Sequence, residues 1–363
     1  MIALALSGGG SRAIAFHLGC LRALQDQGVL SRASVLSAVS GGSVIAGMYA
    51  YSDEGFDEFD RRVVRLLGRG LQKAILVQML SPSLFARVAA TNLISRPVAV
   101  LAKLLKHQPP IRRWASRSDA LEAALEGVFP NIQLGQVARP GLDVVFNACE
   151  LRTGTAFRFG NHRSGTWRFG EIKENFVSVA HAVACSAAYP MFLPAFDRKY
   201  VFAKDGVDQR KRVIITDGGI YDNLGISCLE PGRDRRFSLH TYPADYIICC
   251  YAGHGQFSGE NIPFGFKSRT EASFESVFRK VQDAALQRLH MYKQAGSIKG
   301  FILPYLGQQD NALPFPVPKL VRREDVYGYP TNFAAMAEKD IERLALRGEQ
   351  LTRLLLNHYI PEL

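Results

Sequence analysis

The chain has 363 residues, of which 47% are hydrophobic, and its formal net charge is +11 at pH 7. This length and composition exclude a disordered or fibrous protein and predict one large globular domain over residues 1–363. The start, "MIALALSGGG", lacks the basic segment and cleavage site of a secretory signal peptide, and uncharged apolar runs are shorter than the roughly 18 residues that cross a bilayer. We therefore expect a soluble, cytoplasmic protein.

The first 51 residues predict a strand, a helix, a second strand and a second helix. Ile2 to Ser7 forms a short buried strand that runs into Gly8-Gly9-Gly10, and the helix that follows ends at Gly28. A second strand, Ser34 to Val39, reaches a tight turn at Ser40-Gly41. Because such a unit makes its two strands parallel, we expect the three glycines and Ser40 at one edge of the sheet.

The segment from about 53 to 139 is predicted to be a helical insertion that covers one side of the site. Residues 61–117 contain twelve Lys and Arg and no Asp or Glu, and without them the chain is nearly neutral. In a helical interpretation one face is apolar and the other is cationic. The apolar face comprises Ile94, Pro97, Val98, Leu101, Leu104 and Leu105, and the cationic face Arg96, Lys103 and Lys106.

Two interpretations of this stretch remain open. It suits peripheral contact with an anionic membrane, where each Lys or Arg contributes on the order of 1 kcal/mol. Alternatively, it packs on the protein's own core with its charges solvated. Nucleic acid is not expected as a partner, because only Phe85 and Trp114 offer aromatic rings for base stacking. The Pro-Pro pair at 109–110 is expected to separate two helical pieces.

The rest of the chain adds strands and helices of an α/β protein, with strands that end in small or polar residues. Strands are predicted at 143–148, 213–216 and 246–251, and helices at 57–67, 119–129, 270–294 and 332–359, the last forming a C-terminal helical segment at about 332–360. The six cysteines have no C-x-x-C spacing, which predicts buried, reduced thiols. No cofactor or metal ion is expected, since no calcium-loop pattern of carboxylates occurs.

The glycine-rich turn has two interpretations. Gly8-x-Gly10-x-x-Ala13 fits a relaxed dinucleotide fingerprint, but that site needs an acid after the second strand, and Gln27 to Ser52 contains none. The second interpretation is a nest of N–H groups at a helix N-terminus, which binds a developing oxyanion in acyl transfer. We favour this oxyanion hole, built from Gly8, Gly9 and Gly10.

Ser40 is the predicted nucleophile. Ala38 to Gly42 matches the G-x-S-x-G elbow except that Ala38 replaces the first glycine, and it has the strand–turn–helix context that this motif needs. Ser37 is expected within the strand and Ser43 inside the helix, bonded near the cap. The alternative for Ser40 is a helix N-cap without chemistry.

Asp217 is the predicted general base. It follows an apolar strand on the same sheet edge, and Gly218-Gly219 let the backbone turn sharply behind it. A buried carboxylate near Ser40 can accept its proton if burial raises the carboxylate's pKa toward the working pH. Asp222 is the rival acid, expected instead to bond backbone amides in a turn. In a conventional triad the base would be His254, in "YAGHG".

These blocks together resemble the patatin-like phospholipases. Gly8-Gly9-Gly10-Ser11-Arg12, Ser40 in "AVSGGS" and Asp217-Gly218-Gly219 stand in the family's order, and "FNACELRTGTAFRFG", "ACSAAYPMFLPAF" and "DGGIYDNLGI" resemble the surroundings of these motifs. The resemblance implies a three-layer α/β sandwich with a mostly parallel sheet. It also implies a Ser40–Asp217 dyad, with Gly41, Gly42, Gly218 and Gly219 shaping the two turns and Arg12 supporting the glycine loop or meeting a lipid phosphate.

The expected activity is that of a phospholipase A or lysophospholipase that passes through an acyl-enzyme. Apolar side chains of the insertion are expected to line the acyl channel, among them Leu76, Leu80, Leu84, Phe85, Leu93, Leu101 and Leu104. Hydrolysis of neutral glycerides or other esters is the near alternative. A membrane-binding effector with little hydrolytic activity is the alternative from a different class.

Overall fold

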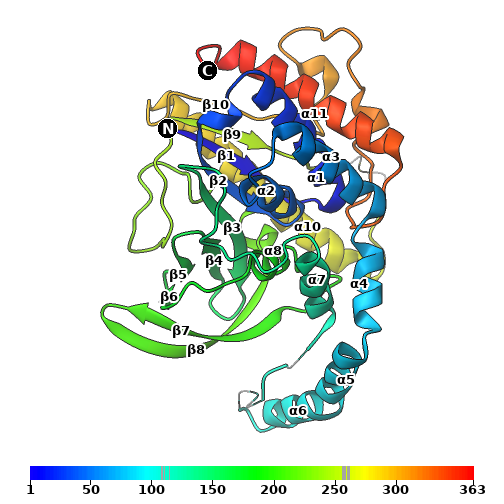
Figure 1. The fold of residues 1–363 in the computed structure, drawn as a ribbon, viewed down its shortest axis with the longest axis vertical. Helices are drawn as coiled ribbons and strands as arrows, with labels where there is room; N and C mark the ends of the chain where they lie inside the picture. Colours follow the sequence, from blue (N-terminus) through cyan, green and yellow to red (C-terminus); the bar gives the residue numbers. More distant parts are fainter. Residues whose placement is uncertain (108, 110, 114, 256–258, 260–261) are drawn as a thin grey trace.

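The structure of the chain is a computed structural model, and it describes residues 1–107, 109, 111–113, 115–255, 259 and 262–363. Pro110 and Trp114 lie outside the described residues, so the separation of two helical pieces predicted at 109–110 stays a prediction. Within them, one ten-stranded sheet forms the centre of the molecule (Figure 1). The order of its strands is β10-β9-β1-β2-β3-β4-β5-β6-β7-β8.

The strands are short in the buried part of the sheet and longest in the hairpin at its far end. They comprise β1 (Ile2–Leu6), β2 (Ala33–Val39), β3 (Asp143–Glu150), β4 (Thr155–Gly160), β5 (Ser164–Thr166), β6 (Gly170–Ile172), β7 (Phe196–Lys204), β8 (Val207–Asp217), β9 (Tyr246–Cys250) and β10 (Gly300–Ile302).

The sheet is mixed. Strands β10, β9, β1, β2 and β3 run parallel to one another, and the pairs from β3 onward to β8 are antiparallel. The predicted strand–helix–strand unit is confirmed, because β1 and β2 are parallel neighbours. The strand predicted at 213–216 is the end of the long strand β8, which pairs with β7 as a hairpin.

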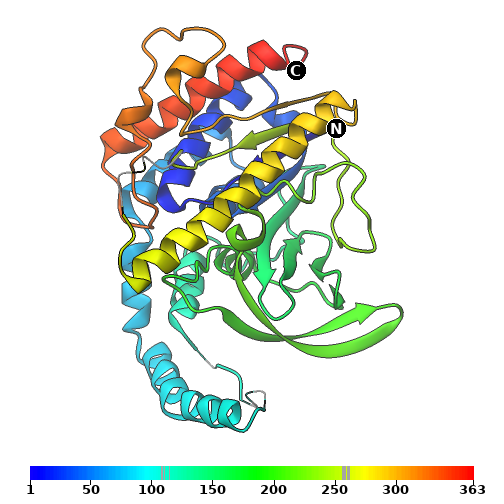
Figure 2. The same cartoon turned by 180° about the vertical axis from the view of Figure 1, so that it is seen from behind.

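Helices cover both faces of the parallel part of the sheet, so the fold is the predicted three-layer α/β sandwich. Side chains alternate along β1: Leu4 and Leu6 belong to the larger core, with α1, α2 and α11, while Ala3 and Ala5 belong to a smaller core under α10. Figure 2 shows α10 running across this second face.

Each predicted helical segment has a counterpart in the structure, although the last begins at Glu338 rather than near 332, and the helices Val179–Ser186 and Gly219–Asp222 were not predicted. The α-helices are α1 (Gly10–Asp26), α2 (Gly41–Ala50), α3 (Phe56–Arg69), α4 (Gln72–Met79), α5 (Pro82–Ala90), α6 (Arg96–Leu104), α7 (Arg117–Glu126), α8 (Val179–Ser186), α9 (Gly219–Asp222), α10 (Phe266–Gln294) and α11 (Glu338–Tyr359).

The helices α4, α5 and α6 extend away from the rest of the molecule, and we call residues 72–105 the arm (Figures 1 and 2). A π-helical turn, Thr91–Ser95, joins α5 to α6. The resulting helix, Pro82–Leu104, is long and apolar enough by length and composition to cross a membrane, although only 17% of its most apolar window is buried. This segment is not an uncharged apolar run, because it contains Arg87, Arg96 and Lys103.

Candidate active site

Ser40 stands in a strained turn between β2 and α2. Its φ is 52° and its ψ is −120°, a backbone conformation that residues other than glycine rarely adopt. The Ser40 side chain makes no capping hydrogen bond to α2, so the N-cap alternative does not describe it. The strained backbone instead has the form of a nucleophile elbow, which holds the hydroxyl out from the strand end.

Glycines allow the elbow to pack directly against the N-terminal loop. A Cβ on Gly41 would lie 2.3 Å from the Gly10 carbonyl oxygen, and a Cβ on Gly42 would lie 2.4 Å from the Leu6 oxygen. Gly10 itself has a φ of +59°, which lets the loop turn into α1. This contact brings the N-terminal ends of α1 and α2 to the same place as Ser40.

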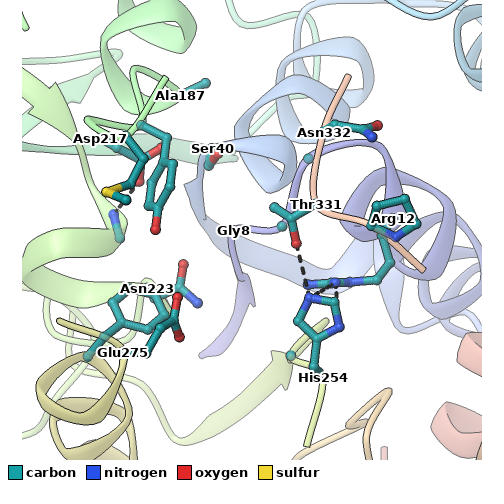
Figure 3. Close-up of a pocket in the computed structure, with 18 of the residues that line it drawn as sticks. Gly8, Arg12, Ser40, Ala187, Asp217, Asn223, His254, Glu275, Thr331 and Asn332 are labelled. Carbon is teal, nitrogen blue, oxygen red and sulfur yellow. Dashed lines mark hydrogen bonds between the residues drawn. The ribbon is translucent and has the colours of Figure 1, made fainter. Parts of the chain in front are cut away.

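The register of β3 explains how Asp217 reaches Ser40. One edge of β3 pairs with β2 up to Val39, which lies opposite Asn147. The next residue, Ala148, lies opposite Asp217 of β8. Since β4 occupies the other edge of β3, β2 and β8 approach each other head-on along the same edge. Ser40, directly after the end of β2, and Asp217, the last residue of β8, thus face each other, and Figure 3 shows their side chains next to each other.

Asp217 is almost fully buried, at 3% exposed. Its Oδ1 accepts a 2.6 Å hydrogen bond from the Gly219 N–H, whereas Oδ2 is buried and accepts no well-formed hydrogen bond from the described residues. Burial raises the pKa of Asp217 from 3.8 to about 7, and the Gly219 amide and the nearby Ser40 hydroxyl offset part of this rise. The free oxygen and the raised pKa are the properties that a general base needs near neutral pH.

Ser186, at the end of α8, supports the elbow. Its hydroxyl accepts a 3.0 Å hydrogen bond from the Ser40 N–H, donates to the Asn147 carbonyl at 2.6 Å, and lies 2.8 Å from the Ser43 hydroxyl. Sequence reasoning missed this residue, because nothing local marks a serine inside "ACSAAYP". Ser43 is inside α2, and Ser37 is inside β2, both as predicted.

The glycine loop differs in one respect from the predicted oxyanion hole. The Gly8 N–H already donates to the Asn223 carbonyl at 3.1 Å, so it is not available to substrate in this arrangement. The Ser11 N–H is also used, by the Asn332 carbonyl at 2.7 Å. Between them, the N–H groups of Gly9 and Gly10 have no acceptor among the described residues, and they lie at the N-terminal end of α1.

Arg12 ties the loop to its surroundings. Its Nε donates to the Ala252 carbonyl at 3.0 Å, and its Nη1 donates to the Tyr329 carbonyl at 2.9 Å and contacts the His254 ring. Of the two roles expected for this arginine, loop support therefore agrees with the geometry. Burial lowers the pKa of Arg12 to about 10.

His254 lines the pocket, but its partners are Arg12, the Tyr327 carbonyl and the Thr331 hydroxyl. Burial and the Arg12 charge lower its pKa to about 4. In Figure 3 it lies across the pocket from Asp217. Asp222 accepts from the N–H groups of Gly225 and Ser227, which is the turn role predicted for it.

A cavity of about 560 Å³ opens above these residues. Its floor contains Gly8 to Gly10, Ser40 and Asp217, and its walls are largely apolar. The walls include Tyr189, Met191, Phe192, Leu193, Phe274, Phe278 and the loop from Pro330 to Phe333.

The prediction that the insertion lines the acyl channel is wrong, since none of the described residues of 53–139 lines this cavity. The apolar residues of the arm lie outside it and are mostly exposed, as with Leu93 at 77% and Leu104 at 74%. The cavity walls come instead from α10, from residues within "ACSAAYPMFLPAF" and from the loop at 330–333, none of which was predicted to line the channel. Packing of distant segments decided this, and local composition does not reveal it.

All six cysteines are buried and free, as predicted. The structure also brings together His17, Cys20 and Cys250, whose ligand atoms lie within 4.8 Å of one another. Burial raises the pKa of the Cys20 thiol, but hydrogen bonds with Cys250 and His17 lower it to about 6 overall. The three residues have the chemistry to hold a soft metal ion. They lie in the core and do not line the cavity, so they take no part in the chemistry considered below.

The comparisons with known proteins define the class. Residues 4–228, more than half of the chain, match the family described as patatin-like phospholipase. The chain belongs to the patatin-like phospholipase family. A search of curated proteins finds no match.

Solved structures show the same fold at low sequence identity. The human GIVD cytosolic phospholipase A2 matches 98% of this chain and 61% of its own, with a TM-score of 0.55 and 13% identity. The same enzyme in complex with methyl gamma-linolenyl fluorophosphonate inhibitor and terbium chloride gives a TM-score of 0.52 at 13% identity, over 98% of this chain and 57% of its own. This chain thus spans about three-fifths of the length of that enzyme.

Proposed function

We propose that the protein is a phospholipase A or lysophospholipase that uses a Ser40–Asp217 dyad and an acyl-enzyme. The observation that supports this most directly is the head-on approach of β2 and β8 along β3, with a strained serine at one end and a buried carboxylate at the other. No histidine is needed in this arrangement, because the pKa of Asp217 is raised to about 7.

The reaction has two halves. In the first, the Ser40 Oγ attacks the ester carbonyl carbon while its proton passes to Asp217; the tetrahedral intermediate then expels the alcohol, which takes that proton. In the second, Asp217 accepts a proton from water as the water attacks the acyl-enzyme. The fatty acid leaves, and the proton returns to Ser40.

The oxyanion hole in this proposal consists of the N–H groups of Gly9 and Gly10, without Gly8. Both lie at the N-terminal end of α1, where the helix dipole favours negative charge. Arg12 holds this loop through the Ala252 and Tyr329 carbonyls. We assign it a positioning role.

The fatty-acyl substrate class is supported by the apolar walls of the cavity, in particular Phe192, Phe274 and Phe278. Neutral glycerides would fit the same walls, so a lipase or general esterase is the second candidate. A membrane-binding effector with little hydrolysis is the third, because the arm exposes apolar and cationic side chains. Cytoplasmic localisation and peripheral contact of residues 61–117 with anionic membrane belong to the proposal.

The test is fatty-acid release from mixed liposomes, followed by lipid mass spectrometry. Ser40→Ala and Asp217→Asn should each lose about a thousandfold or more of the activity, since each removes a member of the acting pair. His254→Ala should retain most of it. A wild-type enzyme without activity would favour the effector, and loss of activity in His254→Ala equal to that of Asp217→Asn would favour a conventional triad.

A fluorophosphonate gives a second measurement. Reagents of this class phosphonylate activated serines, so wild type should gain one adduct at Ser40 by intact mass. Ser43→Ala, which removes a neighbouring hydroxyl in α2, should still be labelled, whereas Ser40→Ala should not.

A further inference from the structure

The helix Pro82–Leu104 buries small and polar side chains and exposes large apolar ones. Its buried side chains are mostly small or polar: Thr91, Ser95 and Ala102 are buried, together with one large residue, Leu84. Large apolar side chains point outward, with exposed fractions of 46–77% for Phe85, Leu93, Ile94, Val100, Leu101 and Leu104. A helix of a water-soluble protein normally turns its large apolar face to the core.

Specific contacts fix this orientation. The Thr91 hydroxyl accepts a 3.1 Å hydrogen bond from the Ala115 N–H, and the Ser95 hydroxyl donates to the Arg112 carbonyl at 3.3 Å. The face of the helix with the small side chains is therefore hydrogen-bonded to residues 112 and 115, which follow the helix in the chain. Turning the large apolar side inward would break these bonds, so the exposed face is built into the arm.

The charges around this face point to one occupant. No Asp or Glu occurs in residues 61–117, and the exposed Arg96 and Lys103 lie on one flank of the apolar stripe on an ideal helix. An apolar stripe flanked by cations matches the interface of an anionic bilayer, where acyl chains take the stripe and headgroups take the cations.

The arm is attached at the pocket. The N–H groups of Leu71 and Gln72, where α4 begins, both donate to the Phe333 carbonyl at 2.9 Å, and Phe333 lines the cavity. Met191 and Phe192, also lining residues, are 46% and 65% exposed. The helix with the exposed apolar stripe is thus joined through α4 to a segment that lines the cavity.

We propose that the arm lies in the plane of an anionic membrane, with Leu93, Val100 and Leu104 inserted among the acyl chains, and brings lipid substrate to the cavity. This inference rests on the proposed function for its substrate. The binding step itself is independent of hydrolysis.

Binding is measured in a Ser40→Ala background, by co-sedimentation with vesicles of phosphatidylcholine alone or mixed equally with phosphatidylglycerol. The parent should bind the mixed vesicles. Leu93→Gln/Val100→Gln/Leu104→Gln should weaken this binding by about tenfold or more, and Arg96→Gln/Lys103→Gln by about fivefold per charge. The matched control, Val207→Gln/Met291→Gln/Leu346→Gln, changes exposed apolar residues of β8, α10 and α11 and should bind as the parent does. Equal binding by the arm variant and the parent would overturn the inference.

Two further measurements test the alternatives to an in-plane helix, which are a helix that spans the bilayer and a second copy of the chain. The tryptophan fluorescence of Leu93→Trp should be quenched most by lipids brominated near the headgroup end of the acyl chain. If bromine near the bilayer centre quenches this fluorescence most, the helix spans the bilayer and the in-plane arrangement is wrong. A lipid-free dimer that the triple arm variant dissociates, without vesicle binding, would assign the face to a second copy.

Hydrolysis of a water-soluble short-chain ester distinguishes the two proposals. If the arm inference is correct, the triple arm variant loses liposome hydrolysis but keeps the rate on this ester within about twofold. If the wild type hydrolyses neither substrate, the proposed function fails, while vesicle binding still decides the role of the arm.

Discussion

Small residues fill the floor of the pocket, where a Cβ on Gly41 would lie 2.3 Å from a carbonyl oxygen, whereas large apolar side chains cover the outside of the arm, where Leu93 is 77% exposed. The floor forms where the N-terminal ends of α1 and α2 meet the ends of β2 and β8, whereas the arm consists of helices. On the floor, backbones pack without room for a methyl group, and the hydrogen bonds of Ser186 fix the elbow. On the arm, apolar surface has no partner among the residues that the structure describes. The first arrangement suits precise placement of reacting atoms, and the second suits contact with a surface outside the protein.

The largest loss of stability is expected where the elbow contacts the N-terminal loop. Gly41→Ala should lower the free energy of unfolding by roughly 2 to 4 kcal/mol and reduce ester hydrolysis by more than about a hundredfold, because the new methyl group must push the elbow away from Gly10. Denaturant titration and kcat/KM measure the two effects.

Gly68→Ala is the matched control. Gly68 lies in α3 with open space around it, so this change should leave hydrolysis intact and stabilise the protein by about 0.5 to 1 kcal/mol. A Gly41→Ala protein as stable and active as this control would show that the floor is less tightly packed than described.

The next prediction concerns pH. Because the carboxylate form of Asp217 accepts the proton, kcat/KM on a soluble ester should rise with pH through a midpoint near 7. The folded-state pKa lies above the ordinary value of 3.8, so the folded state binds this proton more tightly than the unfolded state. Ionisation therefore costs stability progressively as the pH rises from about 4 to about 7.

Asp217→Asn removes that cost. It should stabilise the protein by on the order of 2 to 4 kcal/mol at pH 8 and by much less at pH 4, while hydrolysis is lost. Thermal unfolding of both proteins across this pH range is the measurement. Parallel curves for wild type and variant would mean that burial does not raise this pKa.

A smaller effect is expected for the residue that supports the elbow. Ser186→Ala leaves the Ser40 N–H and the Asn147 carbonyl without this partner, which should cost about 1 to 3 kcal/mol of stability and about tenfold in hydrolysis. Ser276→Ala removes an exposed hydroxyl that bonds its own helix in α10, and it should change neither quantity by a measurable amount. Similar results for the two variants would remove Ser186 from the support of the site.

The smallest effect on stability should come from the outer face of the arm. Leu93→Gln and Leu104→Gln should each change the free energy of unfolding by less than about 0.5 kcal/mol, since both side chains are already exposed. Leu84→Ala, on the buried side of the same helix, should cost about 2 kcal/mol or more. A large loss for Leu93→Gln would mean that the outer face packs against the protein in solution, and it would remove the contrast with the pocket floor.

Local patterns in the sequence were enough to predict much of this protein. The glycine turn, Ser40 at a strand end and Asp217 before two glycines each follow from short-range rules about turns and strand ends, and the structure has β1, α1, β2 and α2 where these rules put them. The turn role of Asp222 and the free thiols follow from similarly local chemistry.

Only the tertiary structure decided which distant groups meet. The pairing of β3 with both β2 and β8, the hydrogen bonds of Ser186, the use of the Gly8 N–H by Asn223 and the cavity walls from α10 join residues far apart in the chain. The orientation of the arm helix was also decided by the tertiary structure. An amphipathic pattern shows that a helix has two faces but does not say which one turns inward. That choice depends on the free energy of all the contacts made together, which a local pattern does not contain.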